Sequence, residues 1–283
     1  MNDVSRANPS TRVGALECAI IVPTLNEQGN VAALIADLDT ALAGRRFEII
    51  FVDDWSSDGT AALVQSIAEQ RSDVRLIRRY GRSGLSSAVV EGMLSTTAPV
   101  LAVIDADRQH DERVLPSLVD FVASGRADLA VGTRYSGEGS TGDWAKDRVL
   151  ASRLATRLAH LLLPIKLSDP MSGFFAVSRK AFEDALPQMS TTGFKVLLDI
   201  VASSPNPLKI EERPYQFRAR LSGESKLDAG VMIDYLLLLA DKFLRRFAPS
   251  RLILFGAVGL TGVAVHLSLL RFGLDLLLLP FAR

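Results

Sequence analysis

The chain has 283 residues, enough for one large domain or two smaller ones with a substantial hydrophobic core. Its formal net charge is +0, from 32 Lys+Arg and 32 Asp+Glu, and the absence of a global basic field argues against nucleic acid as a partner. The single cysteine, Cys18, excludes an intrachain disulfide, and we expect it to be a small buried side chain in a strand.

The amino-terminal segment, residues 1–16, begins with a polar stretch from Met1 to Arg12. This stretch lacks the apolar region of a secretory signal, so we expect a disordered tail. A catalytic domain is predicted to follow over residues 17–228.

Within this domain, short apolar runs alternate with segments of helical periodicity. Runs that are apolar on both faces are typical of a parallel sheet covered by helices on both sides. The alternation therefore predicts an α/β domain built on a mostly parallel sheet. The predicted strands are Cys18–Val22, Phe47–Val52, Val74–Ile77, Val100–Ile104 and Leu129–Gly132, and the predicted helices between them are Asn30–Leu42, Thr60–Gln70, Leu85–Leu94 and Glu112–Ala123.

Beyond Gly132 the alternation becomes less regular. A polar, glycine-rich loop comes first, followed by a basic helix, a turn leading into a strand, a further helix and a last strand. These four elements are predicted at Lys146–Leu163, Asp169–Val177, Phe194–Ala202 and Leu208–Phe217. A glycine- and charge-rich loop then runs to about Leu227.

Polar clusters follow four of the predicted strands, at the point where each strand ends. They are Pro23–Glu27, Asp53–Thr60, Asp105–His110 and Gly132–Arg134. In open α/β sheets, the carboxyl ends of parallel strands form the edge where ligands bind. One such cluster is explained by a solvated turn, but four on one edge predict a binding site.

The cluster after the fourth strand contains Asp105 and Asp107, two residues apart. Strand alternation points both carboxylates the same way, and two hard oxygen donors suit Mg²⁺ or Mn²⁺. Such a metal would neutralise charge on a departing diphosphate. His110 is either a third donor near the metal or a solvated residue at the start of a helix, and the sequence leaves both interpretations open.

Other chemistries fit the sequence poorly. The dinucleotide-binding and P-loop glycine patterns are absent, and so is the Gly-x-Ser-x-Gly pattern of a nucleophile elbow. Three histidines and one cysteine do not build a usual zinc site. His160 lies among apolar residues of a predicted helix, and we expect it to be structural.

The motifs Pro-x-x-Asn-Glu, Asp-Asp-x-Ser-x-Asp-Gly-Thr, Asp-Ala-Asp-x-Gln-His and Gly-Thr-Arg follow one another in that order. In this combination the chain resembles glycosyltransferase family 2, which implies a GT-A fold. Three later segments are similar to dolichol- or polyprenyl-phosphate mannose synthases: Asp169–Phe175, Gly193–Ile200 and Phe217–Leu227. The resemblance runs from about Ala19 to Leu227.

The resemblance implies roles for individual residues. Nucleotide contacts would come from Pro23, Glu27, Asp53, Asp54 and Asp105, and the metal ligands would be Asp105, Asp107 and Gln109. The acceptor phosphate would lie among Arg134, Arg148, Ser152, Arg220 and Lys226, which agrees with the affinity of Arg and Lys for phosphate oxygens. Within these sets the catalytic residues would be Asp107, Arg134, Arg148 and Arg220.

Two residues depart from the family pattern. Trp55 stands where the family usually has a small or polar residue, and Arg108 replaces a common aliphatic residue between Asp107 and Gln109. We expect Trp55 to alter the nucleotide loop and Arg108 to add a charge near the metal.

The carboxyl-terminal part of the sequence is predicted to attach the protein to a membrane. Residues 229–250 include an amphipathic stretch, Val231–Phe247, that is suited to a membrane interface or to a plain core helix. The apolar run that follows it closely favours the interface. Leu252–Leu270, in the predicted membrane region 251–283, is an apolar run with His266 as its only ionisable side chain. As a helix it would span about 28 Å, close to the thickness of the hydrocarbon core.

The cationic residues before this run place the catalytic domain on the cytoplasmic face by the positive-inside bias: Lys242, Arg245, Arg246 and Arg251. The leading functional hypothesis is an inverting transfer of mannose from GDP-mannose to a polyprenyl phosphate. A related synthase using UDP-glucose or another donor is the closest alternative, and a transferase that elongates a polysaccharide fits less well. A non-catalytic membrane scaffold is the alternative from a different class.

Overall fold

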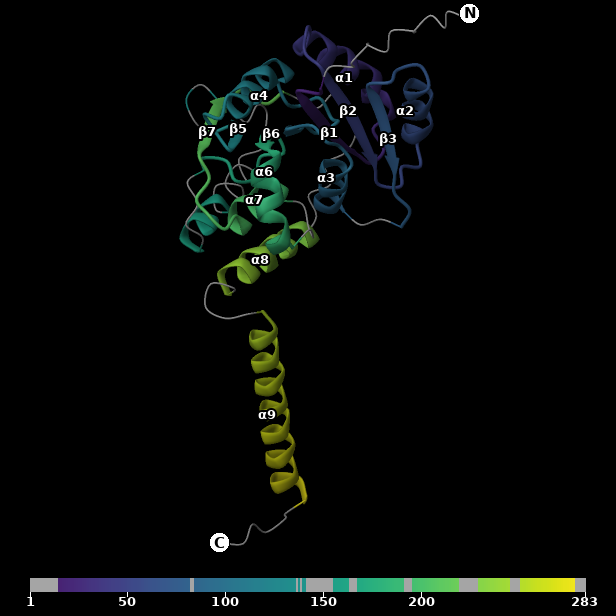
Figure 1. Ribbon diagram of the computed structural model, residues 1–283. Coiled ribbons are helices and arrows are strands. Elements are labelled where there is room, and N and C mark those ends of the chain that lie inside the picture. Colours follow the sequence, from purple (N-terminus) through teal and green to yellow (C-terminus); the bar gives the residue numbers. More distant parts are fainter. Residues whose placement is uncertain are drawn as a thin grey trace, which may run out of the picture. The chain divides into compact units, whose positions relative to one another are not determined.

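The computed structural model (Figure 1) describes most of the chain, and the statements that follow concern that part. The chain divides into two compact units, Met1–Tyr235 and Leu236–Arg283, which are described separately. The described residues are 15–81, 84–135, 137, 139–140, 155–162, 167–190, 195–218, 229–244 and 250–277.

A seven-stranded sheet lies at the centre of the first unit, in the order β3-β2-β1-β4-β6-β5-β7. Neighbouring strands are parallel except at β6, which is antiparallel to both β4 and β5. The strands are β1 Cys18–Thr24, β2 Phe47–Asp53, β3 Val74–Arg78, β4 Val100–Val103, β5 Leu129–Thr133, β6 Phe175–Ser178 and β7 Ile210–Pro214.

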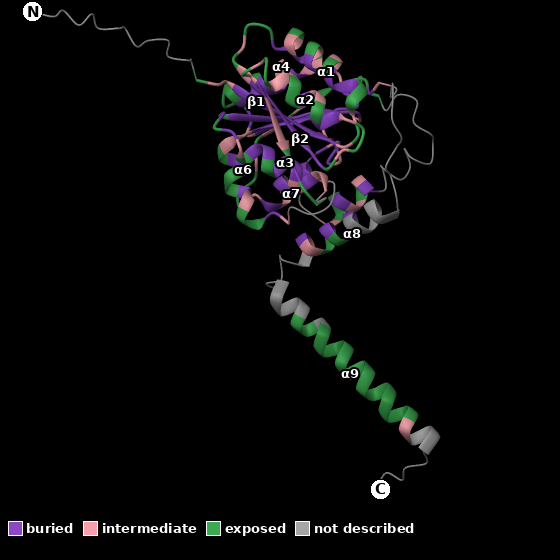
Figure 2. Ribbon diagram, turned by 90° about the vertical axis from the view of Figure 1, so that its right-hand side faces the viewer, coloured by how far each residue is buried: buried purple, intermediate pink, exposed green. Residues whose placement is uncertain are grey.

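Helices cover both faces of this sheet and enclose two hydrophobic cores (Figure 2). Side chains of α1, α2 and α4 build one core, and those of α3, α6 and α7 build the other. Alternation along β1 sends Ile20 to the first core and Ile21 to the second, which explains why the strands are apolar on both faces. The helices are α1 Gln28–Ala41, α2 Thr60–Ala68, α3 Leu85–Leu94, α4 Leu115–Ala123, α6 Arg179–Ala185 and α7 Val196–Ser203, with short 3₁₀ turns η1 Glu112–Val114 and η2 Leu186–Gln188.

The predicted α/β class, the five predicted strands and the four helices between them are confirmed. The strand ends differ from the predicted ends by one or two residues, and the predicted helix at 112–123 begins as a 3₁₀ turn. Cys18 is fully buried in β1, as expected, and burial raises the pKa of its thiol to about 12. At neutral pH this thiol is therefore protonated and behaves as a small apolar side chain.

The second half of the sheet differs from the simplest interpretation of the sequence. β4 and β5 follow one another in the chain, but β6 lies between them in the sheet and runs in the opposite direction. The predicted helix at 194–202 is α7, and the predicted strand at 208–217 shortens to β7. Of the predicted helix at 146–163, residues 155–162 are described and are helical.

Helix α6 was not predicted. It has seven residues, too few for its periodicity to stand out, and it starts immediately after β6. Ser178 caps it, because its hydroxyl accepts a hydrogen bond of 3.2 Å from the backbone N–H of Ala181.

Two helices close the described chain: α8 Ala229–Leu244 and α9 Ser250–Leu277. Leu236 and Leu237 of α8 are exposed, and so are the described large apolar side chains of α9, from Phe255 to Phe272. Among the described residues, no helix combines the length and apolar character needed to cross a membrane. The predicted span at 252–270 lies partly outside that set, because the side chains of 252–254 and 257 are not described.

Candidate active site

The four polar clusters found in the sequence gather at one edge of the sheet. They follow β1, β2, β4 and β5, which all run in the same direction, so their carboxyl ends share that edge. Because β6 runs the opposite way, its amino-terminal end lies at the same edge. The turn before β6 therefore adds a fifth polar segment, Asp169–Phe174, between the clusters of β4 and β5.

The loops after β1 and β2 are joined by hydrogen bonds between backbone and side chains. The backbone N–H of Glu27 donates to the Thr60 hydroxyl at 2.9 Å, and that of Gln28 donates to the Asp58 carboxylate at 3.0 Å. Asn26 receives the backbone N–H of Ser57 at 2.8 Å. These contacts fix the two loops that contain the predicted nucleotide residues Glu27 and Asp54 and that follow Pro23 of β1 and Asp53 of β2.

The two aspartates after β2 have different surroundings. Asp53 is fully buried and accepts the backbone N–H of Ser56 at 3.1 Å, so its carboxylate shapes the loop. Asp54 is also buried and pairs with Arg79 at 3.1 Å. Its carboxylate further accepts the backbone N–H of Gly84 at 3.1 Å, which connects the loop after β2 to the start of α3.

The two departures from the family pattern both adopt a backbone conformation that L-residues rarely take. Trp55 has a φ of 68° and Arg108 a φ of 57°. The Trp55 ring is half exposed and contacts the exposed ring of Tyr80 edge-on, at 5.3 Å between centroids. Arg108 donates two hydrogen bonds to Asp37 of α1, at 2.8 and 3.0 Å, so its charge is paired with that carboxylate.

The segment after β4 contains the predicted metal ligands. Asp107 is buried and accepts the backbone N–H of Gln109 at 3.1 Å. The Gln109 side-chain amide donates to the backbone carbonyl of Arg218 at 3.0 Å, and the backbone carbonyl of Gln109 accepts the Arg218 N–H at 2.8 Å. The end of the described segment after β7, at Arg218, is thus fastened to the segment of the two carboxylates. Asp105 differs in being about a third exposed, with a side-chain accessibility of 35%.

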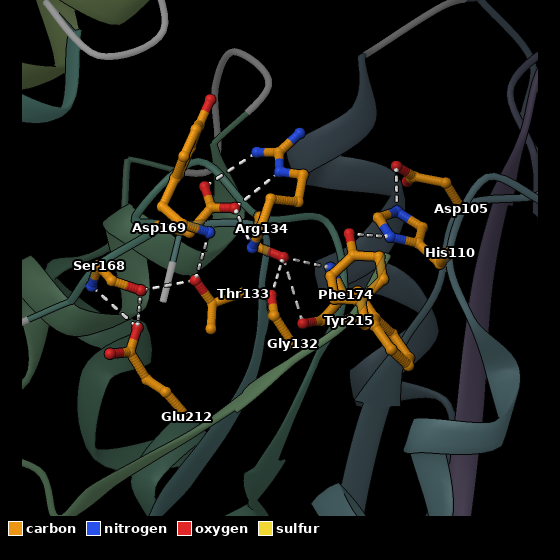
Figure 3. A network of polar contacts seen from close by, with 12 residues as sticks. Asp105, His110, Gly132, Thr133, Arg134, Ser168, Asp169, Phe174, Glu212 and Tyr215 are labelled. Carbon is orange, nitrogen blue, oxygen red and sulfur yellow. Dashed lines mark hydrogen bonds and ion pairs between the residues drawn. The ribbon is translucent and has the colours of Figure 1, made fainter. Parts of the chain in front are cut away.

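His110 follows neither interpretation that the sequence left open. It is 3% exposed, so it is not a solvated residue at a helix start. Its Nε2 lies 3.1 Å from an Asp105 carboxylate oxygen, and its Nδ1 lies 2.6 Å from the Tyr215 hydroxyl (Figure 3). Both ring nitrogens are engaged within the protein, so in this arrangement neither is directed at a metal.

Arg134, a predicted acceptor and catalytic residue, forms a buried ion pair. Its guanidinium donates to both carboxylate oxygens of Asp169, at 2.7 and 2.9 Å, and the exposed fractions of the two side chains are 7% and 0% (Figure 3). Burial alone would lower the pKa of Arg134, but the hydrogen bonds to Asp169 raise it above its ordinary value. The cation is therefore permanent, and its orientation is set by Asp169.

A second network supports this pair from β7. The Thr133 and Ser168 hydroxyls lie 2.5 Å apart, and both the hydroxyl and the backbone N–H of Ser168 donate to Glu212 at 2.8 Å (Figure 3). These bonds hold the residue before Asp169 against the residue before Arg134. The turn that carries Asp169 is thereby tied to two strands.

The charged groups of the site act electrostatically on the Tyr215 hydroxyl. Burial raises the pKa of Tyr215 well above its ordinary value. The field of Arg134 acts to lower this pKa, while the carboxylates of Asp169, Asp105 and Asp107 raise it further. Tyr215 therefore stays protonated across the physiological range, between the carboxylates after β4 and the ion pair after β5.

The carboxylates after β4 match the ligand chemistry of a magnesium or manganese ion. Mg²⁺ typically takes one or two protein carboxylates and completes its shell with water and substrate phosphates. Among the described residues no group of three or more His, Cys, Asp and Glu could hold a metal by itself. Asp105 and Asp107 therefore fit a metal whose remaining ligands come from a bound diphosphate, with the Gln109 carbonyl as the third predicted ligand.

Gly173 makes room for one of these carboxylates. A Cβ atom at this position would lie 2.6 Å from an Asp105 carboxylate oxygen, so the backbone of the β6 turn closely approaches the predicted metal ligand. Only glycine permits this approach without moving Asp105.

Replacing Gly173 with alanine is expected to lower metal-dependent activity by roughly 10- to 100-fold, because the Asp105 carboxylate must turn away. Activity as a function of Mn²⁺ concentration measures this loss. Gly92→Ala is the matched control: its Cβ would lie 2.7 Å from Ile21, and the overpacking should cost about 1–3 kcal/mol of stability without changing the metal dependence. Equal metal dependence in both variants would contradict the prediction.

The remaining predicted acceptor residues lie outside the described residues: Arg148, Ser152, Arg220 and Lys226. Their assignment rests on the sequence. His160 Nε2 donates a hydrogen bond of 2.7 Å to the backbone carbonyl of Leu167, in agreement with the structural role expected for it.

Three residues of the site were not selected from the sequence: Asp169, Tyr215 and Arg79. The first belongs to a segment quoted for the family resemblance, but nothing local indicated that it would pair with Arg134, 35 residues away. Tyr215 lies 105 residues from its partner His110. A buried arginine such as Arg79 implies a carboxylate partner, although the sequence does not say which one.

Comparison with known proteins gives concordant results. The profile of Glycosyl transferase family 2 matches residues 19–186. The chain is 34% identical to a dolichol-phosphate mannosyltransferase of Pyrococcus furiosus, over 89% of this chain and 70% of the relative. It is 36% identical to the protein of that name from Saccharomyces cerevisiae, over 85% and 92%. A polyprenol monophosphomannose synthase of Mycolicibacterium smegmatis is 30% identical over 78% and 84%.

Among solved structures, glucosyl-3-phosphoglycerate synthase from Mycobacterium tuberculosis is similar in fold. Its complex with Mn²⁺, UDP-glucose and phosphoglyceric acid superposes with a TM-score of 0.62 at 19% identity, covering 84% of this chain and 81% of the other. At this level of identity the similarity concerns the fold alone.

Proposed function

We propose that this chain, which belongs to Glycosyl transferase family 2, transfers a mannosyl group from GDP-mannose to a polyprenyl phosphate. The products would be polyprenyl-phosphate mannose and GDP. The observation that carries the proposal is the sheet edge where the Asp105 and Asp107 segment meets the loops after β1, β2 and β5. The names of the relatives supply the sugar and the lipid.

The residues after β1 and β2 would bind the nucleotide. Glu27 and Asp54 lie on loops joined by hydrogen bonds, so the base and ribose would meet a preformed surface. Pro23 and the buried Asp53 would shape this surface from beneath. Asp105, at the neighbouring strand end, would face the diphosphate.

Asp105, Asp107 and Gln109 would hold a divalent metal, Mg²⁺ or Mn²⁺, together with the diphosphate of the donor. When bound there, such an ion neutralises charge on the leaving diphosphate. The buried Arg134–Asp169 pair would present a fixed cationic donor toward phosphate oxygens. Arg148, Ser152, Arg220 and Lys226 would complete the acceptor side.

The acceptor needs no strong general base. A phosphate monoester is already largely anionic at neutral pH, so it can attack the anomeric carbon directly, with inversion. The C–O bond to the nucleotide diphosphate breaks as the new bond to the phosphate oxygen forms. Catalysis would rest on positioning and on the electrostatic field of the site.

We further propose that the carboxyl-terminal unit attaches the enzyme to a membrane. The exposed Leu236 and Leu237 of α8 and the exposed apolar side chains of α9 are suited to a lipid environment. In this arrangement residues 252–270 would span the bilayer and the catalytic unit would face the cytoplasm. A lipid phosphate would then reach the active site from the membrane surface.

The proposed function is tested with membranes that contain the protein. They are incubated with labelled GDP-mannose or UDP-glucose, a polyprenyl phosphate, and Mg²⁺ or Mn²⁺, and label is measured in the lipid phase. We expect label from GDP-mannose to appear in the lipid phase. This label should be lost when EDTA is added or when the polyprenyl phosphate is replaced by free polyprenol. Label from UDP-glucose alone would change the donor, and no lipid product with any donor would refute the proposal in favour of a scaffold role.

A further inference from the structure

A hydrogen-bonded chain of three side chains connects β7 to the predicted metal edge. The Tyr215 hydroxyl lies 2.6 Å from His110 Nδ1, and His110 Nε2 lies 3.1 Å from an Asp105 carboxylate oxygen (Figure 3). Tyr215 and His110 are buried, whereas Asp105 is about a third exposed, with a side-chain accessibility of 35%. These hydrogen bonds thus connect the protein interior to Asp105, which is the only one of the three side chains that is accessible to a ligand.

The direction of hydrogen-bond donation among these three side chains follows from their chemistry. An ionised carboxylate only accepts hydrogen bonds, so the contact with Asp105 requires a proton on His110 Nε2. In a neutral imidazole Nδ1 then carries a lone pair, and it accepts the proton of the Tyr215 hydroxyl. The direction of donation is therefore Tyr215 to His110 to Asp105, and Tyr215 selects the tautomer that Asp105 needs.

Aromatic packing holds the imidazole in place. The His110 ring lies 5.2 Å from the Phe174 ring, 5.6 Å from the Tyr215 ring and 5.4 Å from the Phe217 ring, measured between centroids. All four residues are buried. With three neighbouring rings the imidazole has little freedom to rotate, so the position of its Nε2 is set by the core.

The Asp105 carboxylate is restricted from a second direction as well. The backbone of Gly173 approaches it so closely that a Cβ there would lie 2.6 Å from one carboxylate oxygen. One side of the carboxylate thus meets the turn before β6, and one of its oxygens accepts from His110. Among the described residues, none donates a hydrogen bond to the other oxygen.

We propose that His110 and Tyr215 are positioning residues, which hold Asp105 in the orientation that binds a divalent cation together with a nucleoside diphosphate. This inference rests on the proposed function, since it assigns a metal–nucleotide ligand to that site. Ligating carboxylates are commonly oriented by such outer hydrogen bonds, whose loss weakens metal binding by roughly 10- to 100-fold. Both residues would act through Asp105 and are therefore not assigned as catalytic residues.

The test compares three variants of the full chain. His110→Phe keeps an aromatic ring in the cluster and removes both nitrogens, and Tyr215→Phe removes only the hydroxyl that selects the tautomer. His110→Gln, whose amide N–H reaches about as far as Nε2, restores a donor for Asp105. Lys180→Ala is the control, because it loses only a surface ion pair with Asp184, in which the Lys180 side chain is 82% exposed.

Binding is measured directly, without turnover. Each variant is titrated with Mn²⁺ in the presence of GDP, with free Mn²⁺ followed by electron paramagnetic resonance, and GDP affinity is measured separately without metal. We expect His110→Phe to weaken Mn²⁺ binding by roughly 10- to 100-fold and Tyr215→Phe to weaken it less, with partial recovery in His110→Gln. GDP affinity without metal should stay at the wild-type value, as should both affinities in Lys180→Ala.

Wild-type Mn²⁺ affinity in Tyr215→Phe and His110→Phe would overturn the inference. A parallel loss of GDP affinity without metal and of the thermal midpoint would also overturn it, because it would indicate a structural role only. If His110→Phe does not fold, Tyr215→Phe and His110→Gln still decide. If Mn²⁺ binding depends on His110 but no lipid product forms with any donor, this inference is retained and the proposed function is rejected.

Discussion

Replacing Asp169 with alanine is expected to destabilise the catalytic unit by about 3–5 kcal/mol, because it leaves the buried Arg134 guanidinium without its partner. The two guanidinium hydrogen bonds lost are 2.7 and 2.9 Å long, and the Arg134 side chain is only 7% exposed, so water replaces the carboxylate poorly. The free energy of unfolding from denaturant titration of the full chain, followed by a probe in the catalytic unit, measures the loss.

Two controls separate this effect from general damage. Asp184→Ala removes a carboxylate from a solvent-exposed pair with Lys180 and should change stability by less than about 1 kcal/mol. The double variant Arg134→Met/Asp169→Leu removes both charges and should be more stable than Asp169→Leu alone, since no unpaired charge remains. If the double variant loses at least as much stability as the single one, the burial cost of Arg134 is not the cause.

Replacing Asp107 with asparagine is expected to lower transfer to the lipid about 10³-fold while the protein stays folded. The loss corresponds to several kcal/mol of transition-state charge stabilisation that the metal site would provide. Asparagine keeps the shape of the side chain, and its carbonyl oxygen can still accept the backbone N–H of Gln109, a bond of 3.1 Å in the wild type. The loop geometry should therefore survive, whereas a negatively charged metal ligand is lost.

Lipid-linked label and the thermal midpoint are measured in parallel for this variant. Asp37→Asn is the matched control, because Asp37 is a partly buried carboxylate that pairs with Arg108, the residue directly after Asp107. It should lose at most about 1 kcal/mol of stability and keep its metal dependence. Full transfer activity in Asp107→Asn would mean that the metal site is misplaced.

The first half of the sheet and the edge that carries the site could be predicted from the sequence. Runs such as 47–52 are apolar on both faces because helices cover both sides, and that pattern is local. Polar residues directly after such runs, among them Asp54 and Asp107, must lie at the carboxyl edge of parallel strands. For this reason the segment that contains the predicted metal ligands could be located from the sequence.

How these segments meet is known only from the three-dimensional structure. The order of strands in a sheet depends on long-range packing, and no local pattern indicated that β6 would lie antiparallel between β4 and β5. That insertion brings Asp169 to Arg134 and Gly173 to Asp105, and β7 carries Tyr215 to His110 across 105 residues of sequence. Residue types and their spacing indicate which groups can ionise or coordinate a metal. Which distant residue becomes the partner of such a group depends on the fold.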